Sequence, residues 1–219
     1  MAGVKDGKPT RPYRSAVREE SARRTRQAVV RAATELFVTR GYAATSLADV
    51  AVAAGVARPT VFAAFGSKAA LLRQVLDEAL AGDDEPVPVA ERPWFRPVWD
   101  ARTQGEVLDA YAGVCTLIGG RAAGAFETVR RAADEAPEVA ELWETLLRNR
   151  RAGARMVVDR LVAVDGPLKS GADTGRAVDE LWFYNDPAHY AALVHRCGWT
   201  EESFRHWLAA RMRDALLPR

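Results

Sequence analysis

Residues 42–68, with the sequence YAATSLADVAVAAGVARPTVFAAFGSK, are the most informative stretch of the chain. Ser46, followed by Asp49 three residues later, forms a weak capping box, which marks the start of a helix. Gly55 has no Cβ and can take the left-handed conformation that ends a helix. Between them, apolar residues recur at the spacing of one helical face: Leu47, Val50, Ala51 and Ala54. The pattern therefore predicts a short helix that stops at Gly55.

A second short helix is predicted directly after this glycine. Pro59 is well placed in the first turn of a helix, so we expect the helix to run from about Arg58 to Phe65. Gly66 then breaks the chain, and Ser67 caps a third helix. Two short helices separated by a glycine are typical of a helix-turn-helix unit. The alternative is a generic helical hairpin of an all-α protein.

Charge is distributed unevenly along the 219 residues, although the net charge is only +2. Residues 1–68 carry 12 Lys and Arg against 5 Asp and Glu, a net charge of +7. The remainder carries 19 against 24, a net charge of −5. A basic segment that also holds a helix-turn-helix favours a DNA-reading unit. The basic character alone is equally compatible with a solvated surface.

Several other functional classes find no support in the sequence. No signal peptide and no run of 18 or more apolar residues is present, so we expect a cytoplasmic protein without a membrane span. Cys115 and Cys197 match no metal or redox spacing, and neither do His189, His195 and His206. Nothing resembles a catalytic triad or a phosphate-binding glycine loop, so we expect no enzyme activity, cofactor or metal. A helical enzyme or ligand-binding protein without regulatory DNA binding remains the alternative.

The helical periodicity continues through most of the chain and predicts an all-α fold. We expect four parts: a flexible basic arm over 1–20, a three-helix DNA-binding head over 21–81, a Pro- and Trp-containing connector over 82–105, and a larger helical body over 106–219. In the head, a helix over 21–40 precedes the helix-turn-helix at about 45–64. The helices of the body are expected near 106–119, 121–135, 138–164, 173–185, 187–197 and 201–217. The break between the first two is predicted at Gly119-Gly120.

With these residues in view, residues 22–82 resemble the tetracycline-repressor-like (TetR) family of bacterial transcription regulators. The matching positions are Thr45, Val50-Ala51, Ala54-Gly55-Val56, Phe62, Phe65 and Lys68. A weaker resemblance in the last helices rests on Gly198-Trp199 and Trp207-Leu208. The resemblance implies an all-α, Ω-shaped homodimer whose N-terminal helices bind double-stranded operator DNA and whose body binds a small-molecule effector. It implies a repressor that leaves its operator when the ligand binds, although some relatives activate.

The candidate DNA-binding residues lie in and around the two short helices: Thr45, Ser46, Arg58, Pro59, Thr60, Phe62 and Lys68. The guanidinium of Arg58 can pair with a guanine through two hydrogen bonds. Thr60 offers a hydroxyl and a methyl group, which suit a phosphate or a thymine. Thr45 and Ser46 lie where helix N–H groups suit a phosphate, although they can equally be helix caps. Lys68 suits a phosphate as a point charge, although it can also be a solvated surface charge.

This sequence departs from the family pattern in the second short helix. Ala57 stands where a capping serine is common, and Phe62 lacks the hydroxyl of the usual tyrosine. Ala63 and Ala64 stand where polar or aromatic residues are common. We therefore expect few polar DNA contacts, with alanine methyl groups against thymine methyl groups. Basic residues elsewhere are expected to compensate, namely those of the arm and the cluster Arg23, Arg24 and Arg26.

Aromatic residues concentrate in the body, since all six tryptophans lie beyond position 90. We expect most of them to be core, and a subset to line a pocket for an aromatic or lipophilic ligand. The candidates for this pocket are Trp99, Phe126 and Trp143. The candidates for the dimer interface are Trp182, Phe204, Trp207 and Met212, for which packing within one chain is the alternative.

Overall fold

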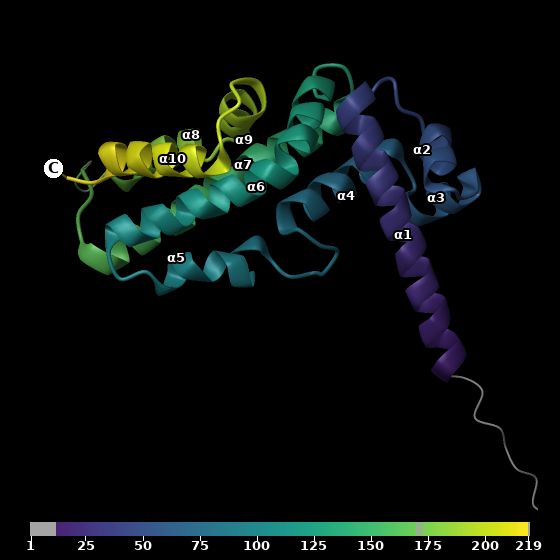
Figure 1. The fold of residues 1–219 in the computed structure, drawn as a ribbon, viewed down its shortest axis with the longest axis horizontal. Coiled ribbons are helices and arrows are strands. Elements are labelled where there is room, and N and C mark those ends of the chain that lie inside the picture. Colours follow the sequence, from purple (N-terminus) through teal and green to yellow (C-terminus); the bar gives the residue numbers. More distant parts are fainter. Residues whose placement is uncertain (1–11, 170, 172, 219) are drawn as a thin grey trace, which may run out of the picture.

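The structure, a computed structural model, describes residues 12–169, 171 and 173–218. Helices account for nearly all of the regular structure in these residues, and the one β-type feature among them is an isolated bridge between Leu168 and Gly171. The expected all-α fold is therefore confirmed. A smaller head at one end of the molecule joins an elongated body at the other (Figure 1). In the described residues, no single helix is both long enough and apolar enough to cross a membrane.

The head and the connector occupy the first half of the chain. The head contains α1 (Pro12–Arg40), α2 (Leu47–Ala54), α3 (Arg58–Phe65) and α4 (Lys68–Ala81). The connector contains η1 (Val89–Glu91), η2 (Pro93–Phe95) and α5 (Arg96–Asp100). The body contains α6 (Gln104–Ala132), α7 (Pro137–Asp165), α8 (Thr174–Tyr184), α9 (Pro187–Tyr190), η3 (Ala191–Arg196) and α10 (Glu201–Leu216).

The local signals around the helix-turn-helix are confirmed in detail. Ser46 and Asp49 form a reciprocal capping box at the start of α2. Gly55 ends α2 in the left-handed conformation, with φ +67°, as a residue without a Cβ can do at little cost. Ala57 gives α3 no side-chain cap, whereas Ser67 accepts a hydrogen bond from the Ala70 N–H and caps α4. The three short helices of the head thus begin and end where the sequence predicts.

The first helix begins earlier than expected. The prediction of a flexible arm over 1–20 is corrected for residues 12–20, which belong to α1. Proline is favoured in the first helical turn, and after Pro12 neither glycine nor proline interrupts the sequence before Gly41. The rest of the predicted arm, residues 1–11, lies outside the described residues.

The long helix α6 forms the spine of the molecule and contacts both the head and the body (Figure 1). It packs against α1 and α4 on one side and against α7, α9 and α10 on the other. Its residues divide between two hydrophobic clusters. One cluster joins the head to the end of α6 and the start of α7, and the other fills the body. Head and body are therefore connected by a shared core.

The predicted break at Gly119-Gly120 is wrong, because α6 runs through both glycines. The reason is packing. The ring of Tyr190 on α9 lies against α6 so closely that a Cβ at Gly119 would be 2.6–2.7 Å from its carbons. Tyr190 is held there by a hydrogen bond from its hydroxyl to Glu201. Gly119 therefore allows the close approach of α9 rather than ending a helix.

We expect the substitution Gly119→Ala to destabilise the fold by about 1–3 kcal/mol, the usual cost of overpacking a core. The matched control is Gly153→Ala on α7, where a Cβ would meet nothing within 4 Å. There the change should stabilise the fold by about 0.5–1 kcal/mol, because alanine restricts the unfolded chain and favours helix. Chemical denaturation of both variants measures the two free energies. Equal effects at the two positions would contradict the packing argument.

The missing cap of α3 gives a second expectation. Ala57 has φ −71° and ψ 141°, the extended conformation of an N-cap residue. Ala57→Ser should therefore stabilise α3 by about 1 kcal/mol, and Ser46→Ala should weaken α2 by a similar amount. Amide hydrogen exchange in the two helices measures each effect locally. If Ala57→Ser left the exchange of α3 unchanged, the absence of a cap would not limit its stability.

Candidate nucleic-acid interface

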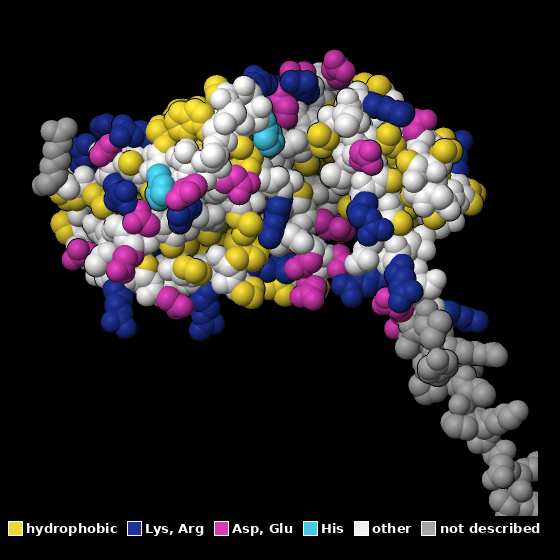
Figure 2. Space-filling view, viewed as in Figure 1, with side chains coloured by type: hydrophobic (Ala, Val, Ile, Leu, Met, Phe, Trp, Pro, Cys, Tyr) yellow, Lys and Arg dark blue, Asp and Glu magenta, His cyan; other side chains and the backbone are white. Residues whose placement is uncertain are grey.

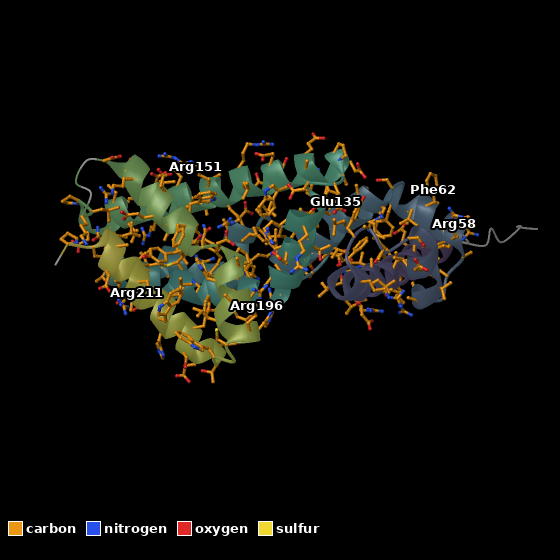
Figure 3. All side chains as sticks on the ribbon, turned by 90° about the horizontal axis from the view of Figure 1, so that it is seen from above. Arg58, Phe62, Glu135, Arg151, Arg196 and Arg211 are labelled. Atoms are coloured by element: carbon orange, nitrogen blue, oxygen red, sulfur yellow. The ribbon has the colours of Figure 1, made fainter. Side chains whose placement is uncertain are left out.

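The two short helices of the head form a helix-turn-helix. The chain direction changes by 112° between α2 and α3, within the range typical of this motif. Val61 points into the core of the head and is fully buried, and Phe65 is half-buried. The exposed residues of α3 are Arg58, Pro59, Thr60, Phe62, Ala63 and Ala64. Arg58 and Phe62 project from the end of the head that lies away from the body (Figure 3).

This exposed surface is largely apolar. The side chain of Phe62 is 63% exposed, and that of Val52 on α2 is 83% exposed. Arg58 and Thr60 are the polar residues of α3, which otherwise presents methyl groups and an aromatic ring. Contiguous exposed apolar surface is typical of a region that contacts a partner. Five predicted contact residues are exposed in the structure: Ser46, Arg58, Pro59, Thr60 and Phe62.

Thr45 is placed differently from this group. It is 1% exposed, and its hydroxyl donates to the carbonyl oxygen of Gly41 at 2.8 Å. Thr45 therefore fastens the turn between α1 and α2 and does not present its hydroxyl to a phosphate. Ser46 is exposed, but its Oγ accepts from the N–H of Asp49 and donates to the Asp49 carboxylate. The capping alternative is thus realised for Ser46, and the hydrogen bonds from Ser46 lower the pKa of Asp49.

Lys68 is half-buried and partly engaged within the head. Its ammonium group donates to the carbonyl oxygen of Tyr42 at 2.9 Å and lies 4.0 Å from the centre of the Tyr42 ring. The Tyr42 hydroxyl in turn donates to Glu138 on α7 at 3.2 Å. An ammonium has three donors, so Lys68 keeps capacity for a second partner. Its position joins α4 to the turn before α2.

The basic cluster of α1 is largely occupied by internal contacts. Arg23 pairs with both carboxylate oxygens of Asp84, which lies beyond α4, at 2.9 and 2.6 Å. This contact lowers the pKa of Asp84 to about 2. Arg26 donates to the carbonyl of Ala64 and to the Gln74 side chain, and its guanidinium lies over the Phe65 ring. Arg23 thus ties α1 to the connector, and Arg26 ties α1 to α3 and α4, which leaves fewer of their donors for the phosphate contacts predicted for this cluster.

The third member of that cluster, Arg24, is more accessible than the other two. Its side chain pairs with Glu20 at 2.9 Å, one turn earlier on α1. Exposed pairs of this kind contribute little to stability and exchange easily with other partners. In Figure 2, Lys and Arg side chains are intermixed with Asp and Glu side chains over the visible face of both head and body.

A cleft of about 600 Å³ lies where the head meets the spine. It is lined by the end of α1 and the turn after it, by Lys68, and by residues 124–136 of α6 and the turn that follows. The hydroxyl of Thr128 on α6 donates to the carbonyl of Phe37 on α1, and this contact is buried. The cleft is lined by none of the three predicted ligand residues.

Those three aromatic residues do not form one group. Phe126 and Trp143 are in edge-to-face contact, with ring centres 5.0 Å apart, in the cluster that joins head and body. Trp99 belongs to the other cluster, where it contacts Phe95 and donates its indole N–H to the Ala90 carbonyl. The structure therefore supports a shared environment for Phe126 and Trp143 only.

Two of the four predicted dimer residues are buried within the chain itself. Phe204 and Met212 are fully buried in the core of the body, so for them the alternative of packing within one chain is realised. Trp182 and Trp207 are half-buried. Phe183 of α8 is 58% exposed, and Trp199, which lies before α10, is 37% exposed. Trp182 and Phe183 differ in exposure because neighbouring residues of a helix point in different directions.

One buried group of the body escaped the sequence analysis. Arg150 on α7 lies between the rings of Phe126 and Trp182 and pairs with Asp186. It stands in the sequence RNRRAGAR, where nothing distinguishes a buried arginine from its exposed neighbours. Only the packing of α6, α7 and α8 reveals its position.

Comparison with known proteins finds matches to one segment of the sequence and to the fold. The model of the family described as "Bacterial regulatory proteins, tetR family" matches residues 29–75, which span the end of α1, the helix-turn-helix and the start of α4. The HTH-type transcriptional regulator TtgR of Pseudomonas putida is 42% identical over 59 residues. That match covers 27% of this chain and 28% of the relative, so it spans less than a third of either protein.

Solved structures extend the likeness to the fold of the whole chain. A protein from Mesorhizobium loti assigned to the TetR-family transcriptional regulators has a TM-score of 0.65 at 16% identity, over 88% of this chain and 95% of that one. NalD of Pseudomonas aeruginosa, the secondary repressor of the MexAB-OprM multidrug efflux pump, has a TM-score of 0.57 at 21% identity, over 90% and 98%. The chain thus resembles the tetR family in the sequence of residues 29–75, and it shares its overall fold with solved structures.

Proposed function

We propose that this protein is a DNA-binding transcriptional regulator that acts in the cytoplasm as a homodimer. In this proposal α3 reads the major groove of an operator, and a small molecule bound in the body releases the protein from DNA. The observation that carries it is the exposed surface of α3, at the outer end of a head that matches the tetR family model. A helix presented in this way fits the major groove.

The chemistry of α3 supports readout by few polar groups and several apolar ones. Arg58 is the group suited to the acceptor edge of a guanine, and Thr60 to a phosphate or a thymine. Phe62, Ala63 and Ala64 suit thymine methyl groups, which are the apolar feature of the major groove. Backbone N–H groups at the start of α2 and the remaining donors of Lys68 suit phosphates. We leave Thr45 out of the proposed contacts because its hydroxyl is used internally.

Release by a ligand needs a mechanical connection from body to head, and α6 supplies one. Its Thr128 holds α1 through the Phe37 carbonyl, and a methyl group of Val38 lies close to Gly124. Val38 is on α1, the helix against which α2 packs. A shift of α6 would therefore move the head as a unit and change the spacing of two heads in a dimer. The same connection would serve an activator.

We propose that dimerisation uses the exposed faces of α8 and α10, in line with the resemblance. Phe183 and Trp199 give this surface its exposed apolar character, and the half-buried Trp207 lies 6.2 Å from the Trp199 ring. Large exposed apolar side chains at one end of a helical body favour association with another apolar surface.

The substitution Arg58→Ala should weaken binding to the operator by roughly 5- to 100-fold, the effect of losing one direct base contact. The operator is first selected from random duplexes by the purified full chain, and affinity is then measured by fluorescence anisotropy. The matched control is Arg196→Ala, which removes the same charge from the body, far from α3 (Figure 3). If no sequence were enriched even at low salt, the proposed function would be wrong.

Salt dependence separates the contribution of the N-terminal residues. Deleting residues 1–11, which carry Lys5, Lys8 and Arg11, should weaken binding and flatten the plot of log affinity against log salt. Each lost phosphate contact lowers the slope by about 0.9. An unchanged slope would exclude these residues from the DNA interface.

The substitution Phe183→Asp should shift the protein from dimer to monomer, because it places a charge in the proposed interface. Sedimentation velocity over a range of concentrations measures the change. Val162→Asp on α7 provides the control, since Val162 is also an exposed apolar residue of the body but lies on another helix. A dimer that persists in Phe183→Asp and dissociates in Val162→Asp would move the interface to α7.

A further inference from the structure

Arg150 carries a positive charge into the interior of the body. Its side chain is 10% exposed, and it lies where α6, α7 and α8 meet. One terminal nitrogen, Nη2, donates to the carbonyl of Trp182 and to the Asn185 side chain, each at 2.9 Å. The guanidinium carbon lies 5.4 Å from the centre of the Phe126 ring and 5.5 Å from that of Trp182. The group is thus enclosed by aromatic rings.

Several hydrogen-bond donors in this group are left without an acceptor. Within the described part of the chain, Nε and Nη1 of Arg150 and the indole nitrogen of Trp182 are buried and make no hydrogen bond. Nη1 lies 3.1 Å from the Asp186 carboxylate, which is an ion-pair distance without aligned hydrogen-bond geometry. Buried donors are nearly always paired in folded proteins, so Nε of Arg150 and the indole N–H of Trp182, which have no acceptor, are available to a further partner.

The surroundings define what that partner must be. Burial raises the pKa of Tyr111 and raises that of Cys115 to about 12, so both stay neutral at physiological pH. Burial lowers the pKa of Arg150, because its charge is poorly solvated. Apart from the partly exposed Asp186, the groups around this guanidinium are neutral, aromatic or hydrogen-bond donors, which favours a ligand with an anionic acceptor on an apolar body. These surroundings disfavour a cation.

The contacts of Asp186 allow a ligand to replace it beside Arg150. Its Oδ1 accepts from the N–H of Ala188 at 2.8 Å, so the carboxylate also caps α9. Its side chain is partly exposed, at 31%. An incoming carboxylate can therefore replace Asp186 beside Nη1 of Arg150 while Asp186 remains on the start of α9.

From this geometry, and resting on the ligand-controlled regulator proposed above, we infer that the body binds an apolar or aromatic carboxylate. The carboxylate is received by Nε and Nη1 of Arg150 and by the indole N–H of Trp182. The apolar part contacts the edge-to-face pair of Phe126 and Trp143. The inference names the chemical class of the effector and the residues that bind its charged group.

The first experiment compares a carboxylate with its neutral amide. Isothermal titration calorimetry of the full chain without DNA uses 2-naphthoate against 2-naphthamide, and decanoate against decanamide. We expect at least one carboxylate to bind about tenfold or more tightly than its amide, as the loss of a charge-assisted hydrogen bond predicts. Equal affinities within both pairs, or no binding of either carboxylate, would overturn the inference.

Three variants assign the effect to these residues. Arg150→Gln and Trp182→Phe should each weaken carboxylate binding by about tenfold. Trp94→Phe, which removes an indole N–H elsewhere in the protein, should leave it unchanged. Asp186→Asn removes the competing carboxylate but can still cap α9, so it should tighten binding several-fold. If the cluster had only a structural role, Asp186→Asn would weaken carboxylate binding instead of tightening it. This variant therefore tests the inference even if Arg150→Gln fails to fold.

These outcomes are separate from those of the proposed function. Ligand binding is measured in the absence of DNA, and operator binding is measured in the absence of ligand. Specific DNA binding without carboxylate binding would overturn the inference alone. Carboxylate binding without any DNA binding would overturn the proposed function while leaving the site intact.

Discussion

The fold depends on the uninterrupted passage of α6 through Gly119 and Gly120. Because Gly119 has no side chain, Tyr190 can lie directly against the helix, and α9 and α10 can close the body around it. The same helix then continues for about three more turns, at 3.6 residues per turn, and reaches α1 through Thr128. A helix broken at the glycines would leave the end of α6 free to move independently of the body. Continuity of this one element makes head and body a single mechanical unit.

The parts of the fold that sequence could predict are those governed by local signals. The capping box of Ser46, the left-handed Gly55 and the cap at Ser67 each act over a few residues, so the helix-turn-helix was predictable residue by residue. The role of Gly119 was not, because it is set by a tyrosine 71 positions later in the chain. The same limit explains Thr45 and Arg26, whose partners lie on other elements. For Phe204 and Met212, the helical stripe was visible, but not which neighbour it would face.

Several basic residues of the N-terminal part of the chain form contacts within the protein, so its net positive charge is a poor guide to the charge available for DNA. The excess of +7 in residues 1–68 overstates what DNA can meet, because Arg23 and Arg26 are fixed within the head and Lys68 is partly engaged. Their charge still contributes to the field around the head, although pairing with carboxylates reduces it. In the proposed function, specific recognition would then rest on Arg58 and on the apolar side chains of α3. Such a surface discriminates sequences by thymine methyl groups and shape more than by hydrogen bonds.

The charged side chain of Arg150 lies between the two hydrophobic clusters. Phe126, on one side, belongs to the cluster that includes the buried residues of the head, and Trp182, on the other, packs against the cluster of the body. A ligand can shift a conformational equilibrium only if it binds the two states with different affinity. Donors that lack partners in the present arrangement supply that difference, since an anion would pair with them and draw α7 and α8 together. Phe126 lies two residues from Thr128, the α6 residue that holds α1. Binding at Arg150 would therefore act on the part of α6 that positions the DNA-reading helix.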